Sequence, residues 1–149
     1  MTAPLQQTSN DYSIWVLPVD GRVEAYCGDT LIASSDNACV MYETRLPPTV
    51  YFPKQDVCGQ LDANSDHRTF CPFKGTASYF NVQADDKDWP NAAWVYEKTL
   101  PEGKDVEGFV AFMPQVLSRL EMQQGAIEPV PSGNITGPTV DWIMRAAWL

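Results

Sequence analysis

The stretch SDHRTFCPFKGTASYF, residues 65–80, predicts two β-strands joined by a tight turn. Residues 68–70 and 76–83 are rich in threonine and aromatic side chains, which favour extended backbone. The joining segment CPFKG ends at Gly75, which can adopt the positive φ that a tight turn needs. Along residues 76–83, even-numbered side chains should face one side of the sheet and odd-numbered ones the other. This unit indicates an antiparallel β architecture.

The rest of the chain repeats this pattern of short strands and turns. Residues 22–35, RVEAYCGDTLIASS, predict a β-hairpin that turns at Gly28 and Asp29. The further elements that we expect are strands at residues 38–43, 50–52, 92–97 and 109–113, and a charged loop over residues 85–91. Residues 54–61 are too short and mixed to assign, and one helical turn stays open there. The 12 prolines oppose long helices. Seven or eight short strands without an internal repeat predict an all-β barrel or bent double sheet.

The C-terminal part of the chain differs from the rest. Residues 125–138 are rich in proline and glycine and predict a linker, whereas residues 114–124 fit either a short helix or a strand end. Residues 139–149, TVDWIMRAAWL, place apolar side chains at helical spacing behind a threonine that can cap a helix. We expect one domain over residues 1–124. The tail, residues 125–149, should end in an amphipathic helix that covers either the domain or a partner. A homodimer formed through this helix is one such arrangement.

Charge and composition exclude several classes of partner. The formal net charge of -9, with no cluster of basic residues, opposes binding to nucleic acid or to an anionic membrane surface. The chain starts without a secretory signal and has no apolar run of about 18 residues, so we expect a cytoplasmic protein. Four isolated cysteines and one histidine form no metal-ligand motif, so we expect neither a metal nor a cofactor.

Three side chains are candidates for acid–base chemistry. His67 carries an imidazole, whose ordinary pKa lies close to neutral pH. Lys74 can pair with a carboxylate, phosphate or enolate oxygen, and Glu43, at the end of a strand, can act as a general base. Each also has a structural explanation: the imidazole can hold a turn, the lysine can be solvated, and the carboxylate can join an ion pair. Both explanations stay open at this point.

Aromatic side chains recur on the central strands and predict an apolar pocket with hydroxyl groups at its rim. They are Tyr51, Phe52, Tyr79, Phe80, Trp94 and Tyr96. Cys71 can be a reactive thiol beside a cation or a small buried side chain. Ser35 lacks the G-x-S-x-G turn of a hydrolase nucleophile. Asp86 and Asp88 could hold magnesium for nucleotidyl transfer, but no glycine-rich phosphate motif accompanies them.

The order of these motifs resembles the family catalogued as domain of unknown function 427, which is also labelled nucleotidyltransferase-like. The resemblance lies within residues 21–116 and is carried by LIASSDNACVMYE, YFPKQDV, SDHRTFCPFKGTASYFNV, AAWVYE and GFVAFMPQV. It implies a β-tent, in which two antiparallel sheets lean together over a cleft. The positions that match the family motif are Ser35, Glu43, Tyr51, Pro53, Asp56, His67, Thr69, Cys71, Lys74, Gly75, Tyr79, Trp94 and Tyr96.

Together these features predict a small-molecule-binding domain that works as a cofactor-independent acid–base enzyme. Its substrate would be a carbonyl-containing metabolite, and its reaction that of an isomerase, cyclase or lyase. His67 or Glu43 would be the base, with Lys74 and Tyr79 stabilising the developing oxyanion. The expected substrate contacts are Ser35, Tyr51, Thr69, Cys71, Trp94 and Tyr96. The alternatives are a non-catalytic module that binds a ligand or peptide, and a nucleotide-handling transferase, as the family label suggests.

Overall fold

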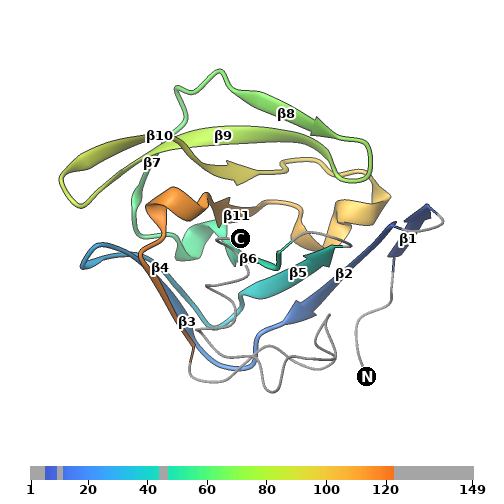
Figure 1. The fold of residues 1–149 in the computed structure, drawn as a ribbon, viewed down its shortest axis with the longest axis horizontal. Helices are drawn as coiled ribbons and strands as arrows, with labels where there is room; N and C mark the ends of the chain where they lie inside the picture. The colour runs from blue at the N-terminus through green and yellow to red at the C-terminus, as the bar shows by residue number, and fades with distance from the viewer. Residues whose placement is uncertain (1–5, 10–11, 44–46, 123–149) are drawn as a thin grey trace.

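The computed structural model describes residues 6–9, 12–43 and 47–122, and these residues form an all-β fold (Figure 1). Twelve strands within them build two antiparallel sheets. The all-β class and the two antiparallel sheets agree with the expectation from the sequence, although the strands outnumber the seven or eight expected. The expected linker and helix, residues 125–149, lie outside the described residues.

The larger sheet has nine strands, in the order β1-β2-β5-β6-β11-β10-β9-β7, with β8 also paired to β9. Their bounds are β1 Gln6–Ser9, β2 Tyr12–Pro18, β5 Cys39–Glu43, β6 Thr49–Pro53, β7 Gln60–Asp62, β8 Arg68–Cys71, β9 Gly75–Ala84, β10 Lys87–Val95 and β11 Phe109–Phe112. The long strand β9 has two short neighbours on its outer edge. Strand β8 pairs with its first half and β7 with its second half.

The smaller sheet has three strands, in the order β12-β3-β4. Their bounds are β3 Val23–Cys27, β4 Thr30–Ser35 and β12 Arg119–Met122. Strands β3 and β4 form the hairpin predicted from the sequence, and Gly28 in its turn has a φ of 59°. The segment left open between a helix and a strand contains both, because the 3-10 helix η3, Pro114–Val116, leads into β12.

The charged loop expected over residues 85–91 is wrong. Only Asp85 and Asp86 form the turn, with φ of 56° and 60°, and β10 begins directly after them at Lys87. Aspartate tolerates this left-handed backbone in a two-residue hairpin turn. Within β10 the register against β9 shifts between Trp89 and Ala93. This irregularity lets the strand accommodate Pro90, which cannot donate a backbone hydrogen bond to a regular ladder.

Both faces of the larger sheet are buried near its centre. One face packs against the smaller sheet and contributes Phe52, Val82 and Val95 to a core that also contains Ile32 and Leu120. The opposite face carries a second buried cluster formed by Ile14, Val16, Cys39, Met41, Tyr51, Ala77, Tyr96, Val106 and Ala111. Alternation along β9 divides its side chains between the two clusters, as the sequence predicted for residues 76–83.

The second cluster is closed by segments outside the sheet. The 3-10 helix η2, Pro101–Val106, buries Val106 in it, and η2 contacts β2. A shorter 3-10 helix, η1, Lys54–Asp56, follows β6 in the segment that the sequence left unassigned. Figure 1 shows β8, β9 and β10 on one side of the molecule and β2 and β5 on the other, with β6 and β11 between. No helix in the described part of the chain is long and apolar enough to cross a membrane.

Candidate functional site

A pocket opens in the larger sheet where strands β6 and β11 stop pairing. Their register covers only Phe52 and Pro53 of β6 with the first two residues of β11. The neighbouring residues, Val50 and Tyr51 on β6 and Phe112 on β11, line the pocket instead. The pocket volume is about 290 Å³. This lies close to the lower end of the roughly 300–1,000 Å³ that ligand pockets span.

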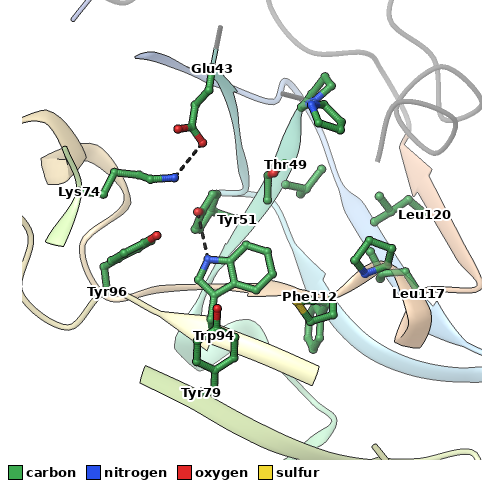
Figure 2. A pocket seen from close by; sticks show the side chains of 15 residues that line it. Glu43, Thr49, Tyr51, Lys74, Tyr79, Trp94, Tyr96, Phe112, Leu117 and Leu120 are labelled. Atoms are coloured by element: carbon green, nitrogen blue, oxygen red, sulfur yellow. Dashed lines mark hydrogen bonds and ion pairs between the residues drawn. The ribbon is translucent and has the colours of Figure 1, made fainter. Parts of the chain in front are cut away.

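The pocket has a polar end and an apolar end (Figure 2). The polar end consists of Glu43, Lys74, Tyr51 and Tyr96. The apolar end consists of Phe112, Leu117 and Leu120. Trp94 lies between them, with its indole nitrogen directed towards Tyr51. The remaining lining residues are Pro47, Pro48, Thr49, Val50, Tyr79, Met113 and Pro114. This distribution suits a molecule with one polar group and an apolar body.

A nearly buried ion pair forms one wall of the polar end. Nζ of Lys74 lies 2.8 Å from Oε1 of Glu43, and the two side chains are 10% and 8% exposed. The same nitrogen lies 4.0 Å from Sδ of Met41 and 5.5 Å from the ring centre of Tyr96. Charges with so little exposure are held in proteins by a partner of opposite sign. Of the alternatives left open by the sequence, the structure thus has a paired lysine rather than a solvated one.

The position of Lys74 follows from its place in the turn between β8 and β9. Gly75 has a φ of 113°, as the turn prediction required, and turns the chain sharply into β9. The carbonyl of Lys74 accepts a 3.0 Å hydrogen bond from the amide of Leu100. The aliphatic stem of Lys74 packs on Gly103, where an added Cβ would lie 3.2 Å from Cα and Cβ of the lysine. These contacts direct the ammonium group across the sheet to β5.

Tyr51 and Trp94 join the polar and apolar ends. The indole Nε1–H of Trp94 donates a 3.2 Å hydrogen bond to the hydroxyl of Tyr51, and the rings meet edge to face with centres 6.2 Å apart. Because a phenol both donates and accepts, Tyr51 keeps its own proton for a further acceptor. Burial raises the pKa of Tyr51 well above its usual value, and burial is also the main reason why the pKa of Tyr96 is raised. Both phenols therefore stay neutral at physiological pH.

His67 and Thr69 lie beside the pocket without lining it. Tyr79, which does line it, is opposite Trp94 in the register of β9 and β10. Oγ1 of Thr69 lies 3.0 Å from the hydroxyl of Tyr79, and the imidazole of His67 packs on the Tyr79 ring with centres 4.5 Å apart. Both His67 and Thr69 are exposed. The imidazole thus packs on a residue that lines the pocket but does not line the pocket itself.

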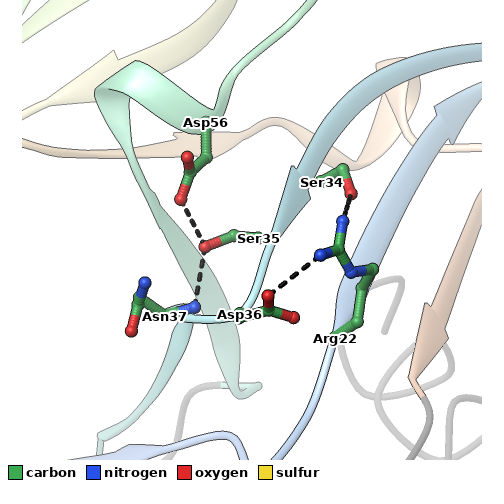
Figure 3. A network of polar contacts seen from close by, with 6 residues as sticks. All are labelled: Arg22, Ser34, Ser35, Asp36, Asn37 and Asp56. Atoms are coloured by element: carbon green, nitrogen blue, oxygen red, sulfur yellow. Dashed lines mark hydrogen bonds and ion pairs between the residues drawn. The ribbon is translucent and has the colours of Figure 1, made fainter.

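Ser35 and Cys71 are also absent from the pocket lining. Ser35 is 2% exposed, and its Oγ donates a 2.6 Å hydrogen bond to Asp56 and accepts one from the amide of Asn37 (Figure 3). These bonds connect the end of β4 to η1, which is a structural role. Cys71 is half-buried at the edge of the second cluster, packed with its apolar residues.

Sequence reasoning missed the apolar end of the pocket. Leu117 and Leu120 come from residues 114–124, in which the strand and helix interpretations stayed open, so the direction of their side chains was undetermined. Phe112 lies on the strand predicted over residues 109–113 but was not selected as a pocket residue. Gly103 was also missed, although a glycine two residues after a proline in a polar segment was visible in the sequence. Among the described residues, no group of three or more histidine, cysteine, aspartate or glutamate side chains is arranged to hold a metal ion.

The fold and the pocket define a small all-β domain with a partly enclosed site of mixed polarity. The chain belongs to the family described as domain of unknown function (DUF427), which matches residues 15–124. This range begins within β2, includes every strand from β3 to β12 and extends beyond the residues 21–116 that carried the resemblance. No curated protein matches the chain.

Proposed function

We propose that this protein binds a small carbonyl compound in the pocket between β6 and β11 and moves a proton on it without a cofactor. The observation that carries this proposal is the Lys74–Glu43 ion pair on the wall of an aromatic pocket. Buried ionisable groups that face a cavity are expensive for stability and are concentrated at functional sites. In our proposal the pocket is also the cleft of the β-tent that the family resemblance implies.

Three polar groups at this end, those of Glu43, Tyr51 and Lys74, have a role in the proposed proton transfer. The Glu43 carboxylate removes a proton from the carbon next to the carbonyl, and the electrons of that C–H bond form an enolate. The Tyr51 hydroxyl donates a hydrogen bond to the enolate oxygen, where negative charge develops. The Lys74 ammonium holds the carboxylate in position and offsets the added charge. Return of the proton to a different carbon completes an isomerisation, and expulsion of a leaving group completes an elimination.

The contacts support Glu43 rather than His67 as the base. Glu43 lines the pocket, whereas His67 is exposed, does not line the pocket and packs on the ring of Tyr79. We therefore propose that His67 and Thr69 hold Tyr79 in place and thereby shape the pocket wall. Ser35 belongs to the bond between β4 and η1 and is left out of the proposed site.

Hydrogen exchange at carbon tests the proposal without knowledge of the natural substrate. 2-Nonanone is incubated with the protein in D₂O, and the loss of its α-hydrogen signals is followed by NMR. We expect exchange above the buffer rate, and loss of that acceleration in Glu43→Gln. The matched control is Glu107→Gln, which removes a carboxylate from the pair with Lys104, far more exposed than the Lys74 pair. Accelerated exchange that persists in folded Glu43→Gln would exclude Glu43 as the base.

The experiment also separates the two alternatives. Binding of 2-nonanone without exchange would support a non-catalytic ligand-binding module that uses the same pocket. If no carbonyl compound tested binds or exchanges its hydrogens, the remaining alternative is the nucleotide-handling transferase that the family label suggests. Addition of nucleoside triphosphate and magnesium, with product analysis by mass spectrometry, tests that alternative directly.

A further inference from the structure

We infer that the pocket selects neutral carbonyl compounds with an unbranched aliphatic chain and discriminates against the carboxylate of the same size. This inference rests on the proposed function, because it names the substrate class of the same site. It follows from three features of the pocket: the partner of the lysine, the free proton of one tyrosine, and the apolar far end.

The ammonium group at the polar end is already engaged. Lys74 Nζ holds the Glu43 carboxylate at 2.8 Å, and both side chains are almost completely buried. A ligand carboxylate that approached this ammonium would enter beside a second carboxylate in a poorly solvated place. Two carboxylates that contact the same ammonium repel each other strongly when water is excluded. A neutral carbonyl oxygen meets no such repulsion.

The hydrogen-bond donor for that oxygen is Tyr51. Its hydroxyl oxygen accepts the indole N–H of Trp94, so the hydroxyl proton points elsewhere. Tyr51 is 1% exposed and lines the pocket. A buried donor that loses water on folding needs an acceptor, and a ligand carbonyl satisfies it. The bond from Trp94 also fixes the direction of the phenol, which makes Tyr51 a specificity-determining residue.

The apolar end determines the rest of the ligand. Phe112, Leu117 and Leu120 lie opposite the ion pair across the pocket, as Figure 2 shows, and offer no polar group. At ~30 Å³ for each water-sized group, a volume of about 290 Å³ holds on the order of ten nonhydrogen atoms. A methyl ketone of that size places its oxygen at Tyr51 and its chain against the leucines. Each methylene removed from the chain should weaken binding about three- to fourfold.

The test compares 2-nonanone with octanoate, which have about the same size, and uses the indole N–H signal of Trp94 as a reporter. The signal is assigned in ¹⁵N–¹H spectra by its absence from Trp94→Phe, and titrations of the wild-type protein give Kd for both compounds. We expect 2-nonanone to shift the signal and to bind at least tenfold tighter than octanoate. Equal or tighter binding of octanoate would overturn the inference and leave the proposed pocket intact. If neither compound shifts the signal, the proposed function itself fails.

Two variants test the charge and the donor separately. Glu43→Gln frees the ammonium of Lys74, so octanoate should bind at least tenfold tighter than it does to the wild-type protein. Tyr51→Phe keeps the ring and removes the hydroxyl, which should weaken 2-nonanone about five- to tenfold. Tyr26→Phe is the matched control, because Tyr26 lies on β3 of the smaller sheet and outside the pocket lining. An unchanged affinity of folded Tyr51→Phe for 2-nonanone would exclude Tyr51 as the donor.

Discussion

Replacement of Lys74 by methionine should destabilise the protein by about 3 kcal/mol, because it removes the ammonium that lies 2.8 Å from the nearly buried Glu43 carboxylate. At 2.8 Å the attraction between the two charges is about 6 kcal/mol for an effective dielectric constant near 20. Burial costs each ion several kcal/mol of hydration, so the intact pair contributes little net stability. Removal of the ammonium takes away this attraction, whereas the carboxylate still loses hydration on burial. We take the lower end of the roughly 3–5 kcal/mol seen for broken buried pairs, since this pair borders a pocket.

The assay is a double-mutant cycle measured by urea unfolding. Lys74→Met and Glu43→Gln should each lose about 3 kcal/mol, which corresponds to a fall in Tm of about 6–12 °C for a chain of this length. The double variant should recover most of that loss, because both charges of this pair are then removed together. Lys104→Met is the control: its side chain is 73% exposed in a pair with Glu107, so it should change stability by less than about 0.5 kcal/mol. A loss below about 1 kcal/mol for folded Lys74→Met would refute the reasoning.

Three further predictions concern single groups. Gly103→Ala places a Cβ 3.2 Å from Cα and Cβ of Lys74 and should displace the ammonium that holds Glu43. It should therefore slow α-hydrogen exchange of 2-nonanone with little change in Tm. An unchanged exchange rate would show that the lysine side chain can shift freely. Burial raises the pKa of Tyr96, so the unfolded state releases its phenol proton first and stability falls above pH ~10; Tyr96→Phe should move the alkaline unfolding midpoint upward in circular dichroism. Burial also raises the pKa of Cys39 to about 12, so its thiol should not react in the folded protein. Iodoacetamide at pH 8 should therefore label the exposed Cys58 in the folded protein and Cys39 only after unfolding, which the masses of the labelled peptides would show.

Local patterns in the sequence were sufficient to predict much of the fold. The hairpin of β3 and β4 and the unit of β8 and β9 were predicted because alternation, glycine turns and β-branched residues all act between neighbours in the chain. Strand β2 was missed although SIWVLP is apolar and the turn-forming residues Asn10 and Asp11 come just before the strand. The start of β10 was missed because charged residues and Pro90 are typical of a loop. The strand accommodates Pro90 through an irregular register against β9.

The candidate site was predictable only in part. Glu43, Lys74 and the pocket aromatics were selected as residues, but their meeting depends on the course of the whole sheet. Four strand intervals, about 19 Å in a flat sheet, separate β5 from β9, so only a folded sheet brings this lysine to this glutamate. His67 was grouped with them because it is near Lys74 in the chain. Proximity in sequence did not reveal that His67 would pack on the ring of Tyr79 outside the pocket lining, whereas Lys74 lines the pocket.

The divided outer edge of β9 affects how molecules of this protein behave in concentrated solution. A ten-residue strand with a free edge would present a long template on which another chain could add a strand. Here β8 and β7 cover successive parts of that edge, and their own free edges are only four and three residues long, respectively. A neighbouring chain therefore finds two brief and separate ladders in place of one continuous one. This arrangement protects against aggregation and makes β8, with Phe70 68% exposed, the segment where charged substitutions should most improve solubility.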